Sequence, residues 1–489
     1  MPKLANKHKN AELVVFADFS GGLNLALPPE SIAMNEMQEC VNFEFAPDTG
    51  LLRVRGGLNA VYTFNAPVTD IIKIAESRTM LVRSGDYIYK LYVAEGVTAT
   101  YIGTVDGDRP ASYELWGEDG AVMAFGGKLY VYDGTDVTAV TGDGAPEAAE
   151  TVYVRSGRVG VTEVEGDEMR FSGVGDPTMW TDVTADDSSA KSVQIGYKDG
   201  CNIKAVAGIA GEIVIFKCPD GEPEIGRIYR LQGDYPDWAV VPYSRGSSAW
   251  NAQSVANVGS DVLFLTREGL GNLATVTEFG DYKLRWAGAK VNPAMSKELT
   301  DGCRLIHIPA RGQVWVTDGQ SDTVWCYHYE IGGGAWTKLK FPGLVKSVAT
   351  SHGEVFLSVG NTVYNMNPRF ESDGESAPIP ATMKPKTIVR NNPVLLKMVT
   401  GSFTSNATSD VKLRIARLEL TFPARVYGGH IAFSDDEKAC LDDEPLVLPT
   451  NAVTLRKRCS IRYERLTPEV EVINGIFSLA SVRLEIAEV

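Results

Sequence analysis

The sequence predicts an all-β protein, in which a β-propeller of six to eight blades is joined to a second β-sandwich or barrel-like domain. Short apolar alternations recur from about residue 68 onward, and strict alternation is the pattern of half-buried strands. Gly-bearing turns separate the alternations, and Gly supplies the positive φ that tight turns need. Helical periodicity is nearly absent over the same length.

Seven segments have the pattern of a hairpin, and their spacing centres near the roughly 40 to 50 residues of a four-stranded blade. A lone hairpin is marginal in water, so a serial array must bury its faces against its neighbours, and radial closure leaves only short edges. A pair of sandwiches or an irregular solenoid is the alternative. The segments are ESRTMLVRSGDYIYKLYV, FGGKLYVYDGTDVTAV, RSGRVGVTEVEGDEMRF, IAGEIVIFKCPDGEPEIGRIYRL, VGSDVLFLTREGLGNLATV, ARGQVWVTDGQSDTVWCYHY and SHGEVFLSVGNTVYNM.

Three regions are predicted: an N-terminal docking segment over residues 1–64, the propeller over 65–371 and a C-terminal β domain over 372–489. Pro, Ser and charged residues interrupt the hairpins near residue 371, as they do in linkers. Beyond this point the alternation runs over longer segments, which suits a separate sandwich or barrel. The segment before residue 65 is a candidate to pack with that C-terminal domain.

The composition and net charge limit the classes of function that this chain can have. The chain of 489 residues is 44% hydrophobic and 22% charged, as in ordinary soluble globular proteins. A net charge of -15 argues against a general nucleic-acid binder, because such binding depends on Lys and Arg displacing counterions from phosphates. The same charge suits a protein that lets DNA slide past. No apolar run approaches the roughly 20 residues of a membrane span, and no apolar secretory segment follows the basic N-terminus.

The residues that usually carry catalysis or bind metals form no known pattern here. The seven cysteines are scattered without a CxxC spacing and are interpreted as core thiols, and the five histidines include no HExxH. GxSxG, phosphate-loop and EF-hand patterns are absent. We therefore expect no catalytic residue, no cofactor and no metal. A carbohydrate-active propeller remains an alternative, since the sequence does not show whether two carboxylates face each other.

The stretch FSGVGDPTMWTDV combines a Pro-set turn with an aromatic side chain. Pro177 and Trp180 follow Gly175 and Asp176, so the turn is expected to form a blade corner in which the indole packs against the propeller.

Four segments together resemble the tail nozzle, or tail hub, proteins of short-tailed bacteriophages, also called packaged-DNA stabilisation proteins. They are DFSGGLNLALPPESIAMNEMQECVNFEF, DTGLLRVRGGL, FSGVGDPTMW and VANVGSDVLFLTREGL, and they reach from residue 18 to about 270. The family's opening elements correspond to Phe19, Gly21, Gly22, Leu23 and Asn24, then Asn35, Glu36 and Asn42, then Gly50, Leu52, Arg53, Arg55 and Gly56.

The resemblance implies a structural virion protein without catalysis. Such a protein forms a homo-oligomeric ring, typically a hexamer, below the portal and adaptor proteins, retains packaged double-stranded DNA and provides the channel for its ejection. Tail fibre, spike or needle proteins are the further partners. The implied location is the virion tail, assembled in the host cytoplasm. A cytoplasmic propeller that binds protein partners remains the main rival.

In this interpretation the N-terminal segment docks to neighbouring subunits and to the tail above. The adjacent glycines let the backbone turn sharply and approach another chain, and SIAMNEMQECVNF is a candidate short helix with Ser31 as its N-cap. An ordinary role in closing the chain's own domain is equally open. The candidate docking residues are Phe19, Gly21, Gly22, Asn24, Asn35, Glu36, Asn42, Arg53 and Arg55.

Two charge blocks of opposite sign lie in the C-terminal region, SDDEKACLDDE and TLRKRCSIRYERL. Opposite charges on facing subunits would orient assembly more than they would add affinity. A solvated acidic loop beside an Arg-rich strand of the same subunit is the alternative. The candidate intersubunit residues are Asp435, Asp436, Asp442, Asp443, Arg456, Lys457 and Arg458.

Overall fold

The computed structural model describes residues 11–74, 78–209, 211–276, 281–374, 376–405, 410–418, 446–447 and 453–488. The chain divides into two compact units. The first comprises Met1–Asn59, Trp325–Lys340 and Asn367–Val489, and the second comprises Ala60–Val324 and Phe341–Met366.

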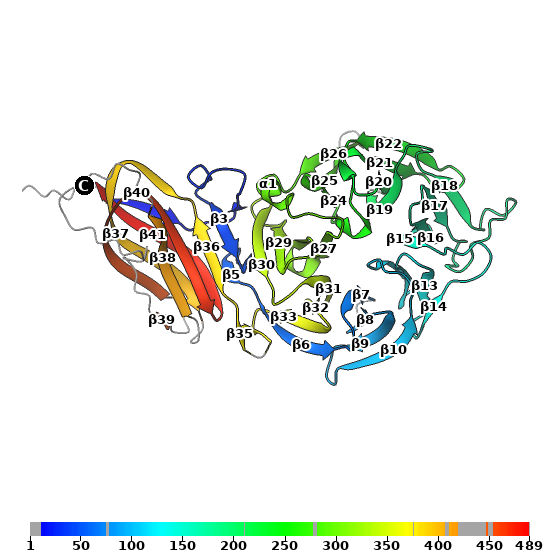
Figure 1. Cartoon of the computed structure of the whole chain (residues 1–489), viewed down its shortest axis with the longest axis horizontal. Helices are drawn as coiled ribbons and strands as arrows, with labels where there is room; N and C mark the ends of the chain where they lie inside the picture. Colours follow the sequence, from blue (N-terminus) through cyan, green and yellow to red (C-terminus); the bar gives the residue numbers. More distant parts are fainter. Residues whose placement is uncertain are drawn as a thin grey trace, which may run out of the picture. The chain divides into compact units, whose positions relative to one another are not determined.

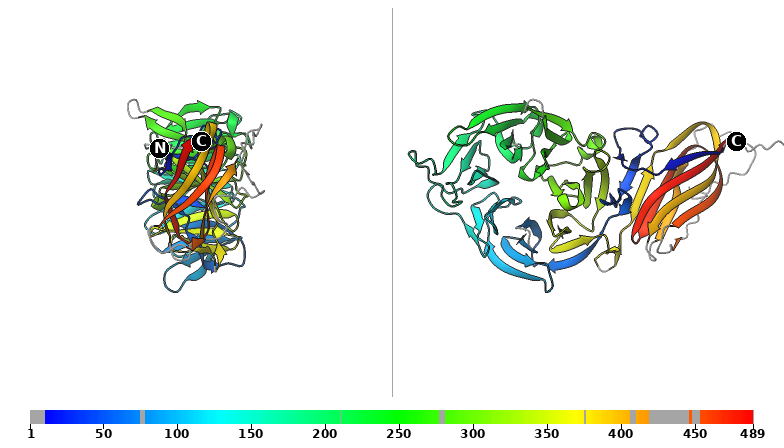
Figure 2. Two further views of the ribbon diagram at one scale, coloured as in Figure 1. Left: turned by 90° about the vertical axis from the view of Figure 1, so that its left-hand side faces the viewer. Right: turned by 180° about the vertical axis from the view of Figure 1, so that it is seen from behind.

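The second unit is built from consecutive four-stranded antiparallel sheets, which follow one another around a common centre in Figures 1 and 2. Turn glycines with positive φ, such as Gly85 between the second and third strands of the first sheet, allow the tight reversals. The first sheet contains β7 (Val68–Lys73), β8 (Thr79–Ser84), β9 (Tyr87–Tyr92) and β10 (Thr98–Thr104), and the second contains β11 (Ser112–Trp116), β12 (Gly120–Ala124), β13 (Leu129–Tyr132) and β14 (Val137–Ala139). The third contains β15 (Ala149–Arg155), β16 (Arg158–Glu163), β17 (Glu168–Phe171) and β18 (Lys191–Gln194), and the fourth contains β19 (Asn202–Ile209), β20 (Glu212–Cys218), β21 (Arg227–Gln232) and β22 (Ala239–Arg245). The fifth contains β23 (Val255–Val258), β24 (Asp261–Thr266), β25 (Gly269–Val276) and β26 (Asp281–Trp286).

A further sheet takes strands from both ends of the propeller sequence. Strands β31 (Val345–Ser351), β32 (Glu354–Val359) and β33 (Thr362–Asn367) are completed by β6 (Gly57–Thr63). The Asn361 side chain donates to the Phe64 carbonyl over 2.8 Å, so the two chain segments are joined beside this sheet. Strand β6 thus completes the last sheet by lying beside β33, and the chain then continues from β6 into β7 of the first sheet.

The large sheet begins with four strands in the same order, β27 (Arg304–Ile308), β28 (Gln313–Thr317), β29 (Thr323–His328) and β30 (Ala335–Lys340). With these four, the described residues contain seven groups ordered like propeller blades. The prediction of an all-β propeller with six to eight blades is confirmed.

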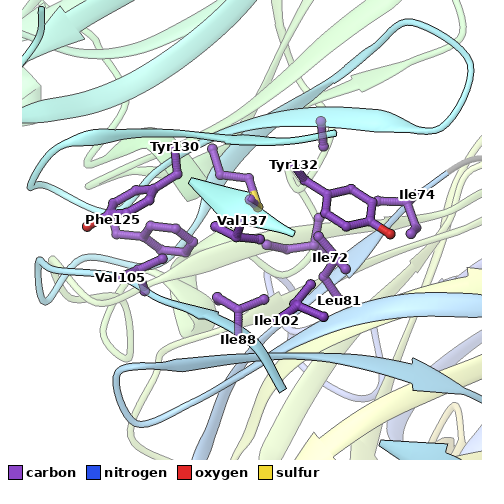
Figure 3. Close-up of a cluster of buried hydrophobic side chains, with 12 residues drawn as sticks. Ile72, Ile74, Leu81, Ile88, Ile102, Val105, Phe125, Tyr130, Tyr132 and Val137 are labelled. Atoms are coloured by element: carbon purple, nitrogen blue, oxygen red, sulfur yellow. The ribbon is translucent and has the colours of Figure 1, made fainter. Parts of the chain in front are cut away.

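Apolar cores lie between successive sheets, because each sheet has an apolar face that a neighbour must cover. Figure 3 shows the core between the sheets of β7–β10 and β11–β14, where Ile72 and Ile102 of the first sheet meet Tyr132 and Val137 of the second. A matching core joins Phe64, Val68 and other residues near the start of the propeller to Phe356 and Val363 near its end. Burial of this core closes the circle of sheets.

Long strands dominate the first unit, which includes the N-terminal strands as well as the C-terminal ones (Figure 1). This confirms the second β domain and the participation of the N-terminal segment in it. Strand β1 pairs with β41, and β4 pairs with β5, which also pairs with β41. Besides β30 and most of β29, its strands are β1 (Ala11–Phe16), β2 (Gly22–Leu23), β3 (Glu36–Val41), β4 (Phe43–Phe45), β5 (Leu52–Val54), β34 (Ser372–Asp373), β35 (Ala377–Pro378), β36 (Ala381–Pro385), β37 (Ile388–Ser405), β38 (Asp410–Leu418), β39 (Leu446–Val447), β40 (Val453–Asn474) and β41 (Phe477–Glu488).

Helices are few and short. Within the described residues they are α1 (Asn292–Met295) and the 3-10 turns η1 (Pro223–Ile225), η2 (Ala252–Ser254) and η3 (Pro309–Arg311). None of the described helices is long and apolar enough to cross a membrane. The short helix expected over SIAMNEMQECVNF is wrong: turns lead into strand β3, whose Met37 and Cys40 are buried. Pairing of β3 with β36 satisfies its backbone groups, which the local sequence signal does not reveal.

Two smaller predictions are confirmed. Trp180 is buried in the core between the second and third sheets, and its indole N–H donates to the Pro177 carbonyl over 2.9 Å. The five cysteines whose side chains are described, Cys40, Cys201, Cys218, Cys303 and Cys326, are buried free thiols.

Candidate functional site

The residues of the N-terminal motif hold one another in place within the first unit. The Asn24 amide donates to Glu36 Oε2 over 2.8 Å, and the same oxygen accepts from the Ala33 backbone N–H over 2.8 Å. Asn24 Oδ1 accepts from the backbone N–H of Ala26 over 3.1 Å. Both ends of the loop between β2 and β3 are therefore fixed by buried polar side chains, and Phe19 is buried just before it.

The paired glycines are required by close backbone packing. The Gly21 N–H donates to the Asn35 carbonyl over 3.0 Å, and a Cβ on Gly21 would lie 2.7 Å from that oxygen. Gly22 has φ of +66°, and a Cβ there would lie 2.5 Å from the Trp336 backbone nitrogen. The expected close approach of backbones at these glycines occurs, and in this structure the approached backbone belongs to the same chain.

Asn42 and Arg55 form the second half of the motif network. Asn42 has φ of +58°, a conformation that Asn tolerates better than most residues. Its Oδ1 accepts from the Lys340 backbone N–H over 2.6 Å and from Arg55 Nε over 3.2 Å, while its Nδ2 donates to the Pro380 carbonyl over 2.7 Å. Arg55 forms an ion pair with Asp373. Three distant segments thus converge on one amide and one guanidinium.

Arg53 lies beside this network and donates to Glu44 Oε1 from Nε and Nη2 over 3.1 and 2.9 Å. Glu44 is fully buried, so Arg53 supplies the charge that its carboxylate needs. Of the nine predicted docking residues, Asn35 and Arg53 are half-buried and the other seven are buried. The structure brings most of them together as internal supports of the first unit.

The two charge blocks are described only in part. Asp435, Asp436, Asp442 and Asp443 lie outside the described residues. Arg456, Lys457 and Arg458 are in β40, with backbones opposite Thr400, Val399 and Met398 of β37. The proposed charge contact between subunits stays a prediction.

An exposed groove of about 470 Å³ lies in the first unit beside strand β1. It is lined by residues 12–15 and 386–390, together with Glu30 and Met34. Leu13 is 52% exposed and Met34 is 42% exposed. Ion pairs lie at the rim, Arg390 with Glu12 over 2.6 Å and Arg465 with Glu30 over 2.7 Å. Exposed apolar side chains ringed by charges are typical of protein interaction surfaces.

A second candidate site is a cavity of about 330 Å³ in the second unit, here called the axial cavity. The first strand of each of the seven sheet groups contributes to its lining. Small residues such as Ala207 and Val152 leave space on one side. The titratable lining residues are Asp70, Tyr113, Glu114, Arg304, His307 and Lys346.

Hydrogen bonds tie the cavity wall together where several first strands begin. The Gln253 amide donates to the carbonyls of Pro110 and Ala111 over 3.0 and 3.2 Å, which joins two sheets that are not consecutive. Arg304 Nη1 donates to the carbonyls of Thr69 and Lys346. Burial lowers the pKa of Arg304, whereas the nearby Asp70 carboxylate raises it.

Asp70 is only partly satisfied at this wall. Its side chain is buried, and Oδ1 accepts from the Ala111 backbone N–H over 2.9 Å. Oδ2 is buried and accepts no hydrogen bond, and the Nη1 atom of Arg83 lies 3.9 Å from it. A buried carboxylate oxygen without a hydrogen-bond donor is costly, and the nearby Arg83 guanidinium offsets part of that cost.

Glu114 and His307 add two groups with shifted pKa values. Burial raises the pKa of Glu114 to about 7. Burial also lowers the pKa of His307, against a hydrogen bond with the Asn257 backbone. Near neutral pH the histidine is uncharged and the carboxyl is divided between its two forms. The cavity therefore contains an acid that can change its protonation state.

Sequence reasoning did not find the axial cavity. Asp70, Glu114 and Arg304 are about 40 to 230 residues apart and share no motif; they line one cavity because each lies on the first strand of a sheet. One feature of the sequence could have indicated this cavity. Charged or polar residues occur within the first strand of several sheets, at positions where an apolar residue would be expected.

Comparisons with known proteins give similarities to solved structures only. No protein-family model matches the sequence, and no curated protein matches it. Among solved structures, virginiamycin B lyase from Staphylococcus aureus is 8% identical with a TM-score of 0.44, covering 63% of this chain and 98% of that one. The WD40 β-propeller domain of Doa1 is 13% identical with a TM-score of 0.41, covering 64% and 97%.

BamB from Moraxella catarrhalis is 10% identical with a TM-score of 0.38, covering 66% of this chain and 92% of that one. With TM-scores below 0.5, these similarities carry no conclusion about this chain, and the functions of these proteins are not carried over to it.

Proposed function

We propose that this chain is a structural subunit of a short bacteriophage tail, which forms a nozzle ring below the portal and adaptor proteins. The observation that carries the proposal is the set of motif residues shared with the tail nozzle family between residues 18 and 58. Their positions give them a physical reason to occur together: Asn24 with Glu36, and Asn42 with Arg55, fix the N-terminal segment inside the first unit.

The proposed assembly surface is the exposed groove beside β1, and its occupant is the adjacent subunit of the ring. Leu13, Val15, Met34 and Val389 supply exposed apolar area, and the buried motif residues hold the loop that carries Met34. In this proposal the motif acts on docking indirectly, by fixing the loop, while the groove makes the contact.

The charge of the chain fits passage of DNA rather than retention by tight contact. A duplex carries one negative charge per roughly 1.7 Å of its axis, so a strongly basic lumen would hold it. With a net charge of -15, the proposed ring presents a mainly acidic or neutral wall. Nanomolar affinity for a DNA duplex at 0.15 M salt would contradict this part of the proposal, because it requires many phosphate contacts.

The deciding experiment measures the native mass of the purified chain, alone and with portal and adaptor rings, alongside averaged electron-microscope projections. The proposal expects discrete rings, six-fold in symmetry, formed alone or on the portal-adaptor template. A stable monomer that ignores those rings would rule it out. The protein-binding scaffold would then become the first alternative to test.

A further inference from the structure

We propose that a pocket between the third and fourth sheets, here called the Trp238 pocket, binds one ring of a neutral sugar. This inference concerns the second unit alone and does not depend on assembly into a tail. Three observations carry it: the contacting aromatic side chains in the lining, the charged side chains of the lining whose formal charges cancel, and a volume that suits one small ring.

The Trp238 pocket is small and reached from solvent. The third sheet contributes Phe171 and the fourth contributes Ile213, both buried, while Trp238 comes from the loop between β21 and β22. Val174 and the Asp234 side chain, also in the lining, are 52% and 62% exposed. The volume of about 190 Å³ is below the roughly 300 to 1,000 Å³ of sites for drug-sized ligands. The pocket therefore suits a single small ring.

The aromatic side chains of the pocket hold one another in place. The ring centroids of Trp238 and Phe171 lie 4.7 Å apart, and those of Trp238 and Tyr235 lie 5.3 Å apart with the ring planes at 72°. Phe171 is buried, whereas Trp238 and Tyr235 are half-buried. Aromatic faces carry partial negative charge and C–H groups carry partial positive charge, so the C–H face of a sugar ring packs well on an indole.

A carboxylate beside these rings can bind a sugar hydroxyl. Asp234 Oδ1 accepts from Ser156 Oγ over 2.8 Å and lies 3.2 Å from Arg155 Nε. Both contacts use Oδ1, so Oδ2 can accept from a ligand hydroxyl in a charge-assisted hydrogen bond. Arg158, by contrast, is buried and donates to the backbone carbonyls of Ser172, Asp187 and Ser189. It supports the wall of the pocket.

The charges of the lining favour a neutral ligand. Two cations and two anions line the pocket, so their formal charges cancel; they are Arg155, Arg158, Asp187 and Asp234. Lys191, near the Tyr235 ring, is paired with Asp182 over 2.6 Å. Sugar hydroxyls both donate and accept, and so match such a lining. An apolar side chain of a partner protein would cover Asp234 without replacing its hydrogen bonds to water, which is costly.

The test is saturation-transfer difference NMR of the full chain with D-glucose, D-galactose, D-mannose and N-acetyl-D-glucosamine. Ligands of this size reach dissociation constants on the order of 1 mM, so each sugar is added at about 20 mM. We expect at least one of them to bind, with saturation strongest at ring C–H protons. Trp238→Ala should weaken this binding about tenfold or more. Trp286→Ala is the matched control, because Trp286 is 37% exposed and lies on β26, outside the pocket.

Asp234→Asn tests the polar contact separately. The Asp234 side chain is 62% exposed, so the variant should fold normally and bind the sugar about threefold or more weakly. Melting temperatures confirm that each variant is folded.

Three outcomes would overturn the proposal. One is that none of the four sugars receives saturation. Another is that Trp238→Ala and Asp234→Asn, both folded, bind the sugar as well as the unchanged chain. The third is that N-acetyl-leucine amide binds, Trp238→Ala abolishes its binding and no sugar binds, which would make the pocket an anchor site for a protein partner.

Discussion

Arg55 and Asp373 form a two-point ion pair, in which Nη1 donates to Oδ1 over 2.9 Å and Nη2 donates to Oδ2. The two side chains are 1% and 8% exposed. The pair joins segments that lie before and after the propeller in the sequence, and both belong to the first unit. Its position explains why an arginine, with a planar fork that matches a carboxylate, occurs there instead of lysine.

Removing one partner of this pair should be strongly destabilising. Arg55→Met leaves the Asp373 carboxylate buried without its cation, and such changes cost about 3–5 kcal/mol of unfolding free energy. We expect this loss in urea unfolding followed by tryptophan fluorescence. The double variant Arg55→Met with Asp373→Leu should recover part of it, because no unpaired charge is left.

The matched control for Arg55 is the exposed pair of Arg267 and Glu224, whose atoms lie 3.1 Å apart. Arg267→Met should cost less than about 1 kcal/mol, since the two side chains are 59% and 37% exposed and their attraction is weakened by solvent. Equal losses in the two variants would show that burial does not govern the Arg55 pair.

A comparison of Gly22 with Gly50 can distinguish the cost of backbone strain from the cost of steric contact. Their φ angles are nearly the same, +66° and +67°, so Ala at either position carries a strain of about 1–2 kcal/mol. A Cβ at Gly22 would also meet the Trp336 backbone, whereas a Cβ at Gly50 meets nothing within 4 Å. Thermal unfolding should therefore show a clearly larger loss for Gly22→Ala than for Gly50→Ala. A larger loss at Gly50 would contradict the close packing at Gly22.

The interfaces between sheets should depend on their aromatic side chains. Phe125 is fully buried, and the Arg83 guanidinium carbon lies 4.8 Å from its ring centroid. Phe125→Ala should cost about 3–5 kcal/mol through lost burial and the cavity that remains. Tyr87→Ala, at a side chain that is 51% exposed, should cost far less. Chemical denaturation of the two variants makes the comparison.

The sequence was sufficient to predict the propeller because its information is local. A hairpin such as Thr79–Ser84 with Tyr87–Tyr92 has short apolar segments and a turn glycine between its strands, although Thr79–Ser84 itself is buried almost throughout and does not alternate. The helix expected after Ser31 failed for the opposite reason. Strand β3 forms because β36, more than 300 residues later, supplies its hydrogen-bond partners, and no local pattern contains that information.

Prediction of the candidate sites was limited in the same way, because the sequence gives local but not long-range information. The motif residues could be selected from the sequence, but whether Asn42 faced a partner or its own chain depended on Lys340 and Pro380. The axial cavity could not be predicted, because it requires the relative placement of seven strands. Long-range geometry, rather than residue type, decides both.

Assembly of the proposed ring should depend on the exposed groove. Leu13→Asp and Met34→Asp place charge at exposed apolar positions, so the subunit should fold normally and fail to form rings. Val183→Asp, at an apolar side chain of the second unit that is 49% exposed, is the control and should assemble. Native mass spectrometry of the three variants decides the matter, and rings formed by both groove variants would exclude this surface.

Glu114 should give the propeller a pH-dependent stability. Its pKa is raised from 4.5 to about 7 in the folded chain, so the folded state holds this proton more tightly than the unfolded state does. The contribution is fully present below about pH 4.5 and is lost as the pH rises to about 7. Gln cannot titrate, so it does not lose this contribution. The melting temperature of Glu114→Gln relative to that of the unchanged chain at the same pH should therefore rise between pH 5 and pH 8, by on the order of a few degrees. A constant difference across this range would show that Glu114 ionises at an ordinary pKa.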